Sequence, residues 1–437
     1  MISRRNLLRT ASLTPLAALT PLTGIFANTI NEERRRGVKP ILKITDVETF
    51  IVRSPNDDAK PDELIDMPPI GFMKGKPGVG HRLDHASPSR PKGHTQTLLV
   101  KIHTDQGIIG WGECHAPTAP RVHQRVISDL LRPILLGQDA LNILPLWEKM
   151  YSSERMRGHS TGYFTTAIAG IDIALWDILG KYLDTPVYQL LGGKFRSTIP
   201  TYTSGKTPEE AAEAIKLGFT GIKTGFGKGS TADDMERIRA MSKAVGTKGQ
   251  LFIDSLGAFN LSEAILVGRK FDEMGNIAWF EDALLPEEYD KYPILAEAID
   301  TPICVGETYS NRFQFRDLLI KNGADAINPD LGRAGGITEC KRIADLADSL
   351  GVLWSAHVSS GFPPYVAASI HLMVATPNAA MIEGGNIAGN TSAFGSRGNI
   401  LLKNPIKYEP GYAHVPEGPG LGIEFDEFKL KELIVRE

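Results

Sequence analysis

Short apolar runs that end in polar residues recur eight times in the second half of this chain, roughly every 22 to 30 residues. The runs lie at 199–202, 221–223, 251–254, 278–281, 303–307, 326–330, 353–357 and 380–383. Stretches with helical periodicity separate several of them, at 208–217, 233–245, 261–274, 313–322 and 337–350. Strands that alternate with helices form parallel sheets, and eight such units predict a closed α/β barrel.

The part before the barrel has a different pattern. Apolar and polar residues alternate at 41–52 and 95–113, and Asp105-Gln106-Gly107 supplies a turn inside the second segment. Helical periodicity follows at about 122–151 and 165–182. This order predicts a small antiparallel sheet followed by helices. The polar, Pro/Gly-rich stretch 54–94 is too long for an ordinary connection, so we expect it to be disordered or to form a lid.

The N-terminus is typical of an export signal. Ser3-Arg4-Arg5-Asn6-Leu7-Leu8 precedes a moderately apolar stretch that ends in small residues near Ala27. This pattern predicts a twin-arginine signal at 1–27, a solvated linker at 28–40 and a periplasmic location. No other stretch is expected to be long and apolar enough to span a membrane, so no membrane contact is predicted after cleavage.

Composition excludes some classes of protein. The chain has 437 residues and a formal net charge of −3, and it lacks a basic stripe interleaved with aromatic residues, so no nucleic-acid partner is expected. Its three cysteines, Cys114, Cys304 and Cys340, are too few and too scattered for a disulfide framework or a zinc cluster. We expect them to be small buried residues.

Acidic residues close three consecutive predicted strands. Asp254, Glu281 and Glu307 are 27 and 26 residues apart. Side chains at the carboxyl ends of barrel strands converge on one face, and three carboxylates at close range need a cation. Oxygen ligands suit Mg²⁺, so the sequence predicts one magnesium ion held by these three residues.

These motifs, in this order, resemble the mandelate racemase/muconate lactonizing group of the enolase superfamily. The resemblance lies in Asp254-Ser255-Leu256-Gly257, Phe280-Glu281-Asp282, Val305-Gly306-Glu307, Pro329-Asp330 with Gly335-Gly336-Ile337, Ala356-His357, and the segments 170–177 and 418–422. It implies a modified TIM barrel, (β/α)7β, that lacks its last helix and is closed by an α+β capping domain. The expected domains are a capping domain at 41–160 with its lid at 54–94, a barrel at 161–398, and a return to the capping domain at 399–437.

Two further strand ends indicate the base. Asp330 and His357 end consecutive strands, which would let the carboxylate orient the imidazole toward the substrate. The pair resembles the His-Asp dyad of the family. Glu383 ends the eighth strand and resembles the family acid that hydrogen-bonds the substrate carboxylate opposite the metal. Such a donor would stabilise charge that develops as the α-proton leaves.

The second strand departs from the racemase pattern. Lys223 keeps the first lysine of Lys-x-Lys, but Gly225 stands where the second, base-forming lysine would be. Lys223 either holds the substrate carboxylate or lines the strand end. Leu256 replaces the histidine that resembles the general acid of some sugar-acid dehydratases. A site with one base argues against two-base racemisation and favours elimination or ring rearrangement.

The expected substrate is a small carboxylate, most simply a sugar acid. Dehydration to a 2-keto-3-deoxy acid is the first hypothesis, and cycloisomerisation or epimerisation of a sugar acid, its lactone or its anhydro form is the second. A binding protein of another class, which keeps the fold without turnover, is the third. Further expected substrate contacts are Tyr163, His159, Tyr309, His81 and Arg82, and the resemblance implies a homo-oligomer.

Overall fold

The computed structural model describes residues 41–53, 64–66, 89–91, 96–117, 119–227, 231–359, 361–384 and 398–435. The described residues from Leu42 onward form one compact unit. The predicted export signal, the predicted linker and most of the predicted lid, including His81 and Arg82, lie outside the described residues. Within the stretch 54–94, β2 (Leu64–Asp66) and β3 (Ser89–Pro91) form an antiparallel pair.

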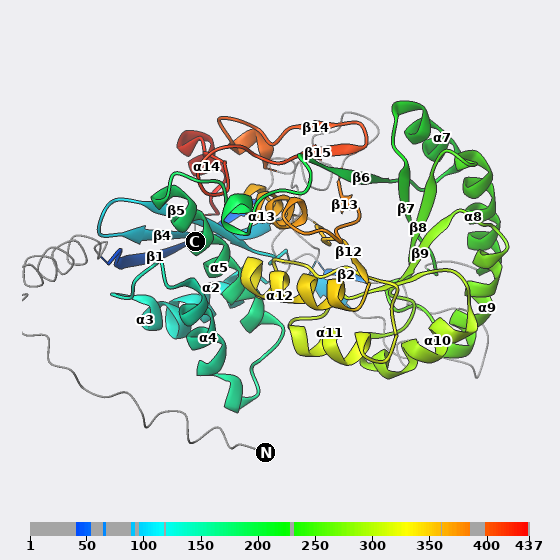
Figure 1. Cartoon of the computed structure of the whole chain (residues 1–437), viewed down its shortest axis with the longest axis horizontal. Coiled ribbons are helices and arrows are strands. Elements are labelled where there is room, and N and C mark those ends of the chain that lie inside the picture. The colour runs from blue at the N-terminus through cyan, green and yellow to red at the C-terminus, as the bar shows by residue number, and fades with distance from the viewer. Residues whose placement is uncertain are drawn as a thin grey trace, which may run out of the picture. The chain divides into compact units, whose positions relative to one another are not determined.

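A three-stranded antiparallel sheet and a group of helices form the first part of the unit (Figure 1). The strands are β1 (Ile44–Arg53), β4 (Gln96–Thr104) and β5 (Ile109–Cys114), in the order β1-β4-β5. Gly107, with φ of 78°, makes the predicted turn between β4 and β5. The helices are α2 (Pro120–Arg125), a π-helical turn (Val126–Leu131), α3 (Arg132–Leu135), α4 (Ile143–Ser153), a 3-10 turn (Arg155–Arg157), α5 (Tyr163–Tyr182) and α6 (Val187–Leu190).

The expected continuous helical stretch at 122–151 is interrupted. Gly137, with φ of 75°, ends the helix, and the chain then pairs with the beginning of the sheet. The N–H of Ala140 donates to the carbonyl of Leu42, and the N–H of Ile44 donates to the carbonyl of Gln138. The stretch 136–142 is therefore a strap that fixes the start of β1, a role that helical periodicity does not encode.

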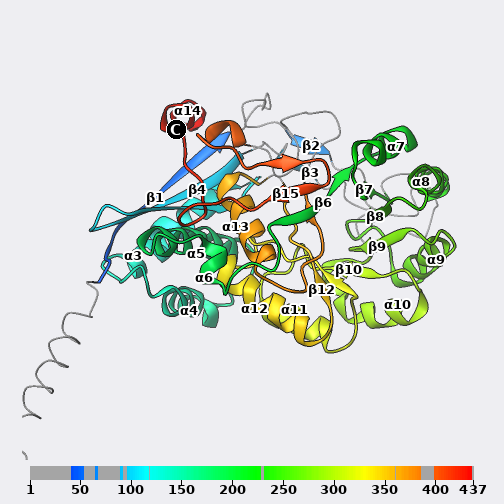
Figure 2. The same ribbon diagram turned by 45° about the horizontal axis from the view of Figure 1, so that its top comes forward.

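Eight parallel strands form the predicted barrel (Figures 1 and 2). They are β6 (Thr198–Ser204), β7 (Gly221–Gly225), β8 (Gln250–Asp254), β9 (Ile277–Glu281), β10 (Ile303–Val305), β11 (Ala326–Ile327), β12 (Leu353–Trp354) and β13 (Ile382–Glu383). Strands β6 to β12 are neighbours in chain order, so that β6 pairs with β7 and so on up to β11 with β12. Strand β13 pairs in parallel with β6. The bridge between Trp354 and Ala379 closes the barrel.

Seven helices follow the first seven barrel strands in the described part of the chain. They are α7 (Pro208–Leu217), α8 (Thr231–Val245), α9 (Leu261–Asp272), α10 (Tyr292–Ala298, after a 3-10 turn at Pro286–Lys291), α11 (Arg312–Leu319), α12 (Gly336–Ser349) and α13 (Pro363–Val374). Helices α10 and α13 were not among the predicted stretches. Several begin at side-chain caps: Thr207 accepts from the N–H of Glu210, and Asn260 and Glu263 form a capping box.

The C-terminal segment packs back on both parts. A 3-10 turn (Asn399–Leu401), β14 (Tyr408–Glu409), β15 (Tyr412–His414) and α14 (Glu427–Leu433) complete the described elements. Strand β15 adds to β6 in antiparallel orientation, and the N–H of Val435 donates to the carbonyl of Ile51 in β1. Phe425 also packs on Trp111 of β5, with ring centroids 4.7 Å apart. The tail therefore ties the small sheet to the barrel.

Helix α5 corrects one expectation about membranes. With 20 residues, α5 is long and apolar enough to span a bilayer. No such segment was expected outside the predicted signal. However, 83% of that window is buried inside the protein. Helix α5 packs against β4, β5 and α12, so its apolar character belongs to the core. The three cysteines are buried and free, as expected.

Candidate active site

Strand alternation explains why polar side chains meet at one end of the barrel. The inward residues Tyr202, Phe252, Trp279, Cys304 and Ala326 pack together inside it. Side chains two positions further along a strand point to the same side. Asp254 and Glu281 therefore continue the inward rows of Phe252 and Trp279, and Asn328 and Asp330 continue the row of Ala326.

Glu307 breaks this alternation, and Gly306 explains how. Strand β10 ends at Val305, two residues earlier than expected, and Gly306 has φ of 136°. A Cβ at Gly306 would lie 2.4 Å from the ring of Phe315, so only glycine fits there. The chain turns at this residue, and Glu307 points into the site. Strands β11 and β12 also end before the expected polar residues, but Asp330 and His357 form an isolated parallel bridge beyond them.

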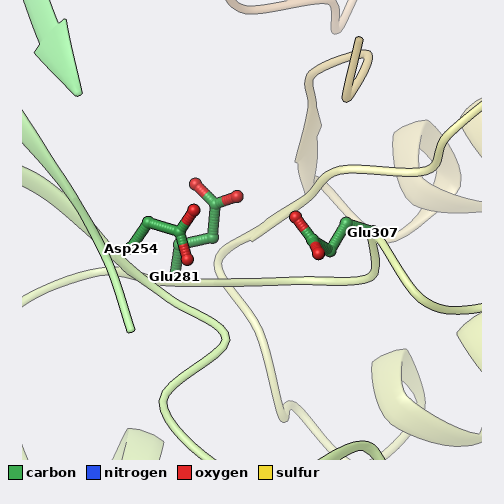
Figure 3. Close-up of side chains that lie close together, drawn as sticks. All are labelled: Asp254, Glu281 and Glu307. Atoms are coloured by element: carbon green, nitrogen blue, oxygen red, sulfur yellow. The ribbon is translucent and has the colours of Figure 1, made fainter. Parts of the chain in front are cut away.

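The three predicted acidic residues lie together and form what we call the carboxylate cluster. One carboxylate oxygen of each lies within 4.8 Å of the others. Figure 3 shows Asp254 and Glu281 next to each other, with Glu307 reaching toward them from the opposite side. Glu281 and Glu307 are buried, and Asp254 is partly exposed. An all-oxygen, anionic set of this kind fits a hard divalent cation.

Other side chains hold the cluster in place. Glu281 accepts hydrogen bonds from Trp279 Nε1 at 3.0 Å and from Asn328 Nδ2 at 2.8 Å. Asp254 accepts from the N–H of Leu256 at 3.1 Å. Burial, with repulsion from the two neighbouring acids, raises the pKa of Glu281 to about 7, although Lys223 opposes the shift. A cation would remove the repulsion that causes part of this increase.

Lys223 lies against the cluster rather than at a free strand end. Its Nζ is 2.8 Å from Glu281 Oε1, 3.1 Å from Asp254 Oδ2 and 4.0 Å from Glu383 Oε1. Burial alone would lower the pKa of Lys223, but the charges of Asp254 and Glu281 raise it well above its usual value. Lys223 is therefore a fixed positive charge beside the cluster.

Asp330 and His357 also meet, and we call them the His-Asp pair. His357 Nδ1 lies 2.9 Å from Asp330 Oδ2, and its Nε2 lies 3.0 Å from Glu307 Oε2. Burial would lower the pKa of His357, but the charge of Glu307 and the hydrogen bonds with Asp330 and Glu307 raise it well above its usual value. The imidazole thus joins the pair directly to the carboxylate cluster.

Glu383 lies between His357 and Lys223. Its Oε2 is 3.8 Å from His357 Nε2 and accepts from the N–H of Val358 at 3.2 Å, while Oε1 faces Lys223. All seven residues that were predicted for catalysis and metal binding are therefore in one place. These are Lys223, Asp254, Glu281, Glu307, Asp330, His357 and Glu383.

The residues predicted to contact the substrate lie in different surroundings, one beside the carboxylate cluster and two exposed. Tyr309 is buried and lines a pocket of about 150 Å³ with Glu307, Asp282 and Leu256, and within the described residues its hydroxyl has no hydrogen-bond partner. His159 is exposed, and Tyr163 is 56% exposed at the start of α5, where its ring packs edge-on against His123. No hydrogen bond or ion pair in the described part of the chain joins either to the carboxylate cluster.

Several neighbours of the His-Asp pair were missed from the sequence. His115, just after β5, places Nδ1 2.8 Å from Asp330 Oδ2. Arg333 Nε lies 3.4 Å from the same oxygen, and the Tyr365 hydroxyl donates to the carbonyl of His357 at 2.6 Å. Two polar residues, Glu113 and His115, flank Cys114 at the end of a predicted strand. This pattern could have indicated His115 as a candidate site residue.

A closed parallel barrel with three carboxylates at consecutive strand ends and a histidine beside them is the arrangement that the resemblance to the enolase superfamily predicted. The family comparisons agree: the enolase C-terminal domain-like family matches residues 206–429, and the N-terminal domain of the mandelate racemase/muconate lactonizing enzyme family matches residues 86–192. The chain belongs to this family and is an enzyme. Enzymes of the superfamily use a divalent metal.

Individual relatives are similar over most of their length. The chain is 33% identical to a D-galactarolactone cycloisomerase of Agrobacterium fabrum over 372 residues, 80% of this chain and 95% of that one. It is 33% identical to a D-galactonate dehydratase of Verminephrobacter eiseniae, covering 77% and 90%. The solved structure of the 3,6-anhydro-D-galactonate cycloisomerase of Zobellia galactanivorans matches with a TM-score of 0.73 at 32% identity, covering 90% and 100%.

Proposed function

We propose that this enzyme is a magnesium-dependent sugar-acid dehydratase. It would remove the proton α to the carboxylate and then eliminate the β-hydroxyl as water, which gives a 2-keto-3-deoxy acid. The observation that carries the proposal is the 3.0 Å contact between His357 Nε2 and Glu307 Oε2. It puts a potential base next to a potential metal ligand, so one substrate can contact both.

Asp254, Glu281 and Glu307 would hold the magnesium ion. When bound, the ion would supply positive charge beside the substrate carboxylate, where negative charge increases as the α-proton leaves. The ion would then partly neutralise the charge of Glu307. Glu307 would therefore raise the pKa of His357 by a smaller amount than it does without the ion. The imidazole can act as a base only when Nε2 is unprotonated.

The residues of the chain divide the remaining work. Asp330 accepts from His357 Nδ1–H and so keeps Nε2 directed at the substrate. Nε2 takes the α-proton as the Cα–H bond breaks. The electron pair then forms the Cα–Cβ double bond while the Cβ–O bond breaks, and a proton from His357 converts the leaving hydroxyl to water. Tautomerisation of the resulting enol gives the 2-keto acid.

Glu383 and Lys223 face the other part of the substrate. Lys223, already paired with two carboxylates, provides fixed positive charge next to the place of the substrate carboxylate. Glu383, when protonated, would donate a hydrogen bond to that carboxylate. Gly225 and Leu256 put no second base on the opposite face, which supports elimination over two-base epimerisation.

Cycloisomerisation is the second candidate. It is supported by the D-galactarolactone cycloisomerase and the 3,6-anhydro-D-galactonate cycloisomerase among the similar proteins. The same α-proton abstraction would then open or close a ring. The product would be an isomer of the substrate, whereas dehydration lowers the mass by one water molecule.

A substrate panel in heavy water tests both proposals. The purified enzyme, with Mg²⁺, is incubated with aldonic acids, uronic acids and their lactones and anhydro forms. We expect α-proton exchange with at least one acid, and formation of a 2-keto acid that mass spectrometry detects as the loss of water. An isomeric product would support cycloisomerisation instead. Binding without any exchange would overturn both and favour a binding protein.

We also propose that residues 1–27 direct twin-arginine export to the periplasm, and the support is the sequence pattern alone. Replacement of Arg4 and Arg5 by lysine should keep the full-length chain in the cytoplasm. Immunoblots of cell fractions measure this, and a shortened periplasmic product from the double variant would contradict the proposal.

A further inference from the structure

We propose that His115, at the end of capping-domain strand β5, is a positioning residue that orients the base His357 through Asp330. The proposal rests on the proposed function of His357. One carboxylate oxygen, Asp330 Oδ2, is 2.8 Å from His115 Nδ1 and 2.9 Å from His357 Nδ1. The two imidazole planes are nearly parallel, at 3°, with centroids 6.3 Å apart.

The end of β5 is pressed against the loop that carries Asp330. The N–H of His115 donates to the carbonyl of Gly332 at 3.3 Å. A Cβ at Gly332 would lie 2.7 Å from the Cβ of His115, so the two backbones can approach this closely only with glycine. The ring of Tyr365 packs on His115 with centroids 5.6 Å apart. His115 therefore belongs to the capping domain by its place after β5, but it is packed directly against the barrel residues Gly332 and Tyr365.

The protonation of this group follows from its burial and hydrogen bonds. His115, Asp330 and His357 are all buried. Burial would raise the pKa of Asp330, but the charges of His115 and Arg333 and the hydrogen bonds with His115 and His357 hold it well below its usual value. An ionised carboxylate only accepts, so Nδ1 of both histidines carries a proton. Burial lowers the pKa of His115, although the charge of Asp330 and its hydrogen bond oppose this shift.

A second donor on the same oxygen restricts the carboxylate. With His357 alone, Asp330 could rotate toward Arg333, whose Nε is 3.4 Å away. With His115 in place, Oδ2 must stay where it accepts from both imidazoles. Groups of this kind, which orient the partner of a functional histidine, typically affect activity 10- to 100-fold when removed. His115 would thus make the geometry of the base depend on the capping domain.

Two substitutions separate the hydrogen bond from mere packing. His115→Asn places an amide N–H near the position of Nδ1, and His115→Leu fills the space without a donor. In the full-length enzyme with Mg²⁺, we expect His115→Leu to lower kcat about 10- to 100-fold with KM nearly unchanged. His115→Asn should restore most of kcat. If the leucine variant does not fold, His115→Phe, which keeps a ring, replaces it.

A second measurement needs no substrate. In enzyme labelled with ¹⁵N-histidine, the Nδ1 proton of His357 that is shared with Asp330 is observed by NMR and assigned by its loss in His357→Asn. We expect it to keep its chemical shift in His115→Asn and to move or broaden in His115→Leu. His371→Leu removes another fully buried histidine, which contacts Tyr188 and Leu421, and it should change neither this signal nor kcat.

The outcomes distinguish this inference from the proposed function. An unchanged His357 signal and unchanged kcat in His115→Leu would overturn the positioning role. Equal losses in the asparagine and leucine variants would also overturn it, because packing of the ring would then explain the effect. If the wild-type enzyme acts on no acid, the proposed function fails, yet the NMR comparison still decides whether His115 orients His357.

Discussion

The carboxylate cluster and the His-Asp pair are supported in different ways, although they touch through Glu307 and His357. The cluster is held mainly by barrel residues: Trp279 and Asn328 fix Glu281, and Lys223 bridges it to Asp254. The His-Asp pair needs residues from outside the barrel. His115 contacts Asp330, and Glu113 of the same strand accepts from the backbone N–H groups of Phe362 and Tyr365 at the start of α13.

This difference separates two properties of the enzyme. Cation binding should depend on the barrel alone, because its ligands and their supports come from barrel strands. Orientation of the proposed base His357 should depend on the capping domain, which contributes His115. In such an arrangement, movement or loss of the capping domain affects proton abstraction more than metal affinity.

The largest expected effect is from Glu281→Gln, which removes one negative charge of the proposed magnesium site, from a side chain that Trp279 and Asn328 hold by hydrogen bonds. Mg²⁺ binding should weaken strongly, and α-proton exchange should fall at least about 10³-fold, equivalent to roughly 4 kcal/mol of barrier. Calorimetry measures the first, and exchange in heavy water the second. Removal of divalent ions with a chelator should have the same effect on the wild type.

A matched control is Glu287→Gln, an exposed carboxylate in the segment that follows β9. It should bind Mg²⁺ and exchange the α-proton like the wild type. Full activity of the Glu281 variant, or of the chelator-treated enzyme, would show that the carboxylate cluster holds no essential ion. The proposed role of this cluster in cation binding would then be wrong.

The two sites also differ in how far the sequence could predict them. Asp254 and Glu281 stand at regular strand ends, two residues beyond inward barrel residues, so the repeat alone predicts their convergence. His357 and Asp330 follow from the same logic, although their strands end earlier. His115 could not be found this way, because its contact with Asp330 joins residues 215 positions apart in two different domains. The strand period of β5 specifies its buried face but not the barrel loop that it meets.

Local pattern was also insufficient where the backbone leaves regular structure. Glu307 points inward only because Gly306 turns the chain, and the strap at 136–142 replaced an expected helix. Helix α13 is apolar on all sides and fully buried, so it shows no amphipathic period to recognise. His159 and Tyr163, which were expected to contact the substrate, are exposed. The sequence does not show how the loop before α5 lies.

The His-Asp pair can be tested separately by a substitution of its histidine. His357→Asn should reduce α-proton exchange about 10²- to 10⁴-fold, because it removes the proton acceptor while its amide can still donate to Asp330. Mg²⁺ affinity should change only a few-fold, since the carboxylate cluster is intact. Calorimetry and exchange are measured on the same preparation. A loss of Mg²⁺ binding as large as that of Glu281→Gln would show that the two groups form one inseparable unit.

The smallest effect is on stability and concerns the tie between domains. Burial raises the pKa of Glu113 from 4.5 to about 7, against hydrogen bonds from Phe362, Thr97 and Tyr365 that lower it. Between these values the unfolded chain loses the proton and the folded chain keeps it. The contribution of Glu113 is therefore most favourable below pH 4.5 and is lost as the pH rises to about 7, by about 3 kcal/mol in total.

Glu113→Gln should remove this dependence. The variant loses hydrogen bonds at every pH, but its stability relative to the wild type should improve between pH 5 and pH 8, by up to about 3 kcal/mol. Urea unfolding at the two pH values measures the difference, with the exposed Glu297→Gln as control. If the difference between wild type and variant were the same at both pH values, Glu113 would be ionised in the folded enzyme throughout. The negative charge of Glu113 would then act on Asp330 at all times, and the capping domain would tune the His-Asp pair electrostatically as well as by position.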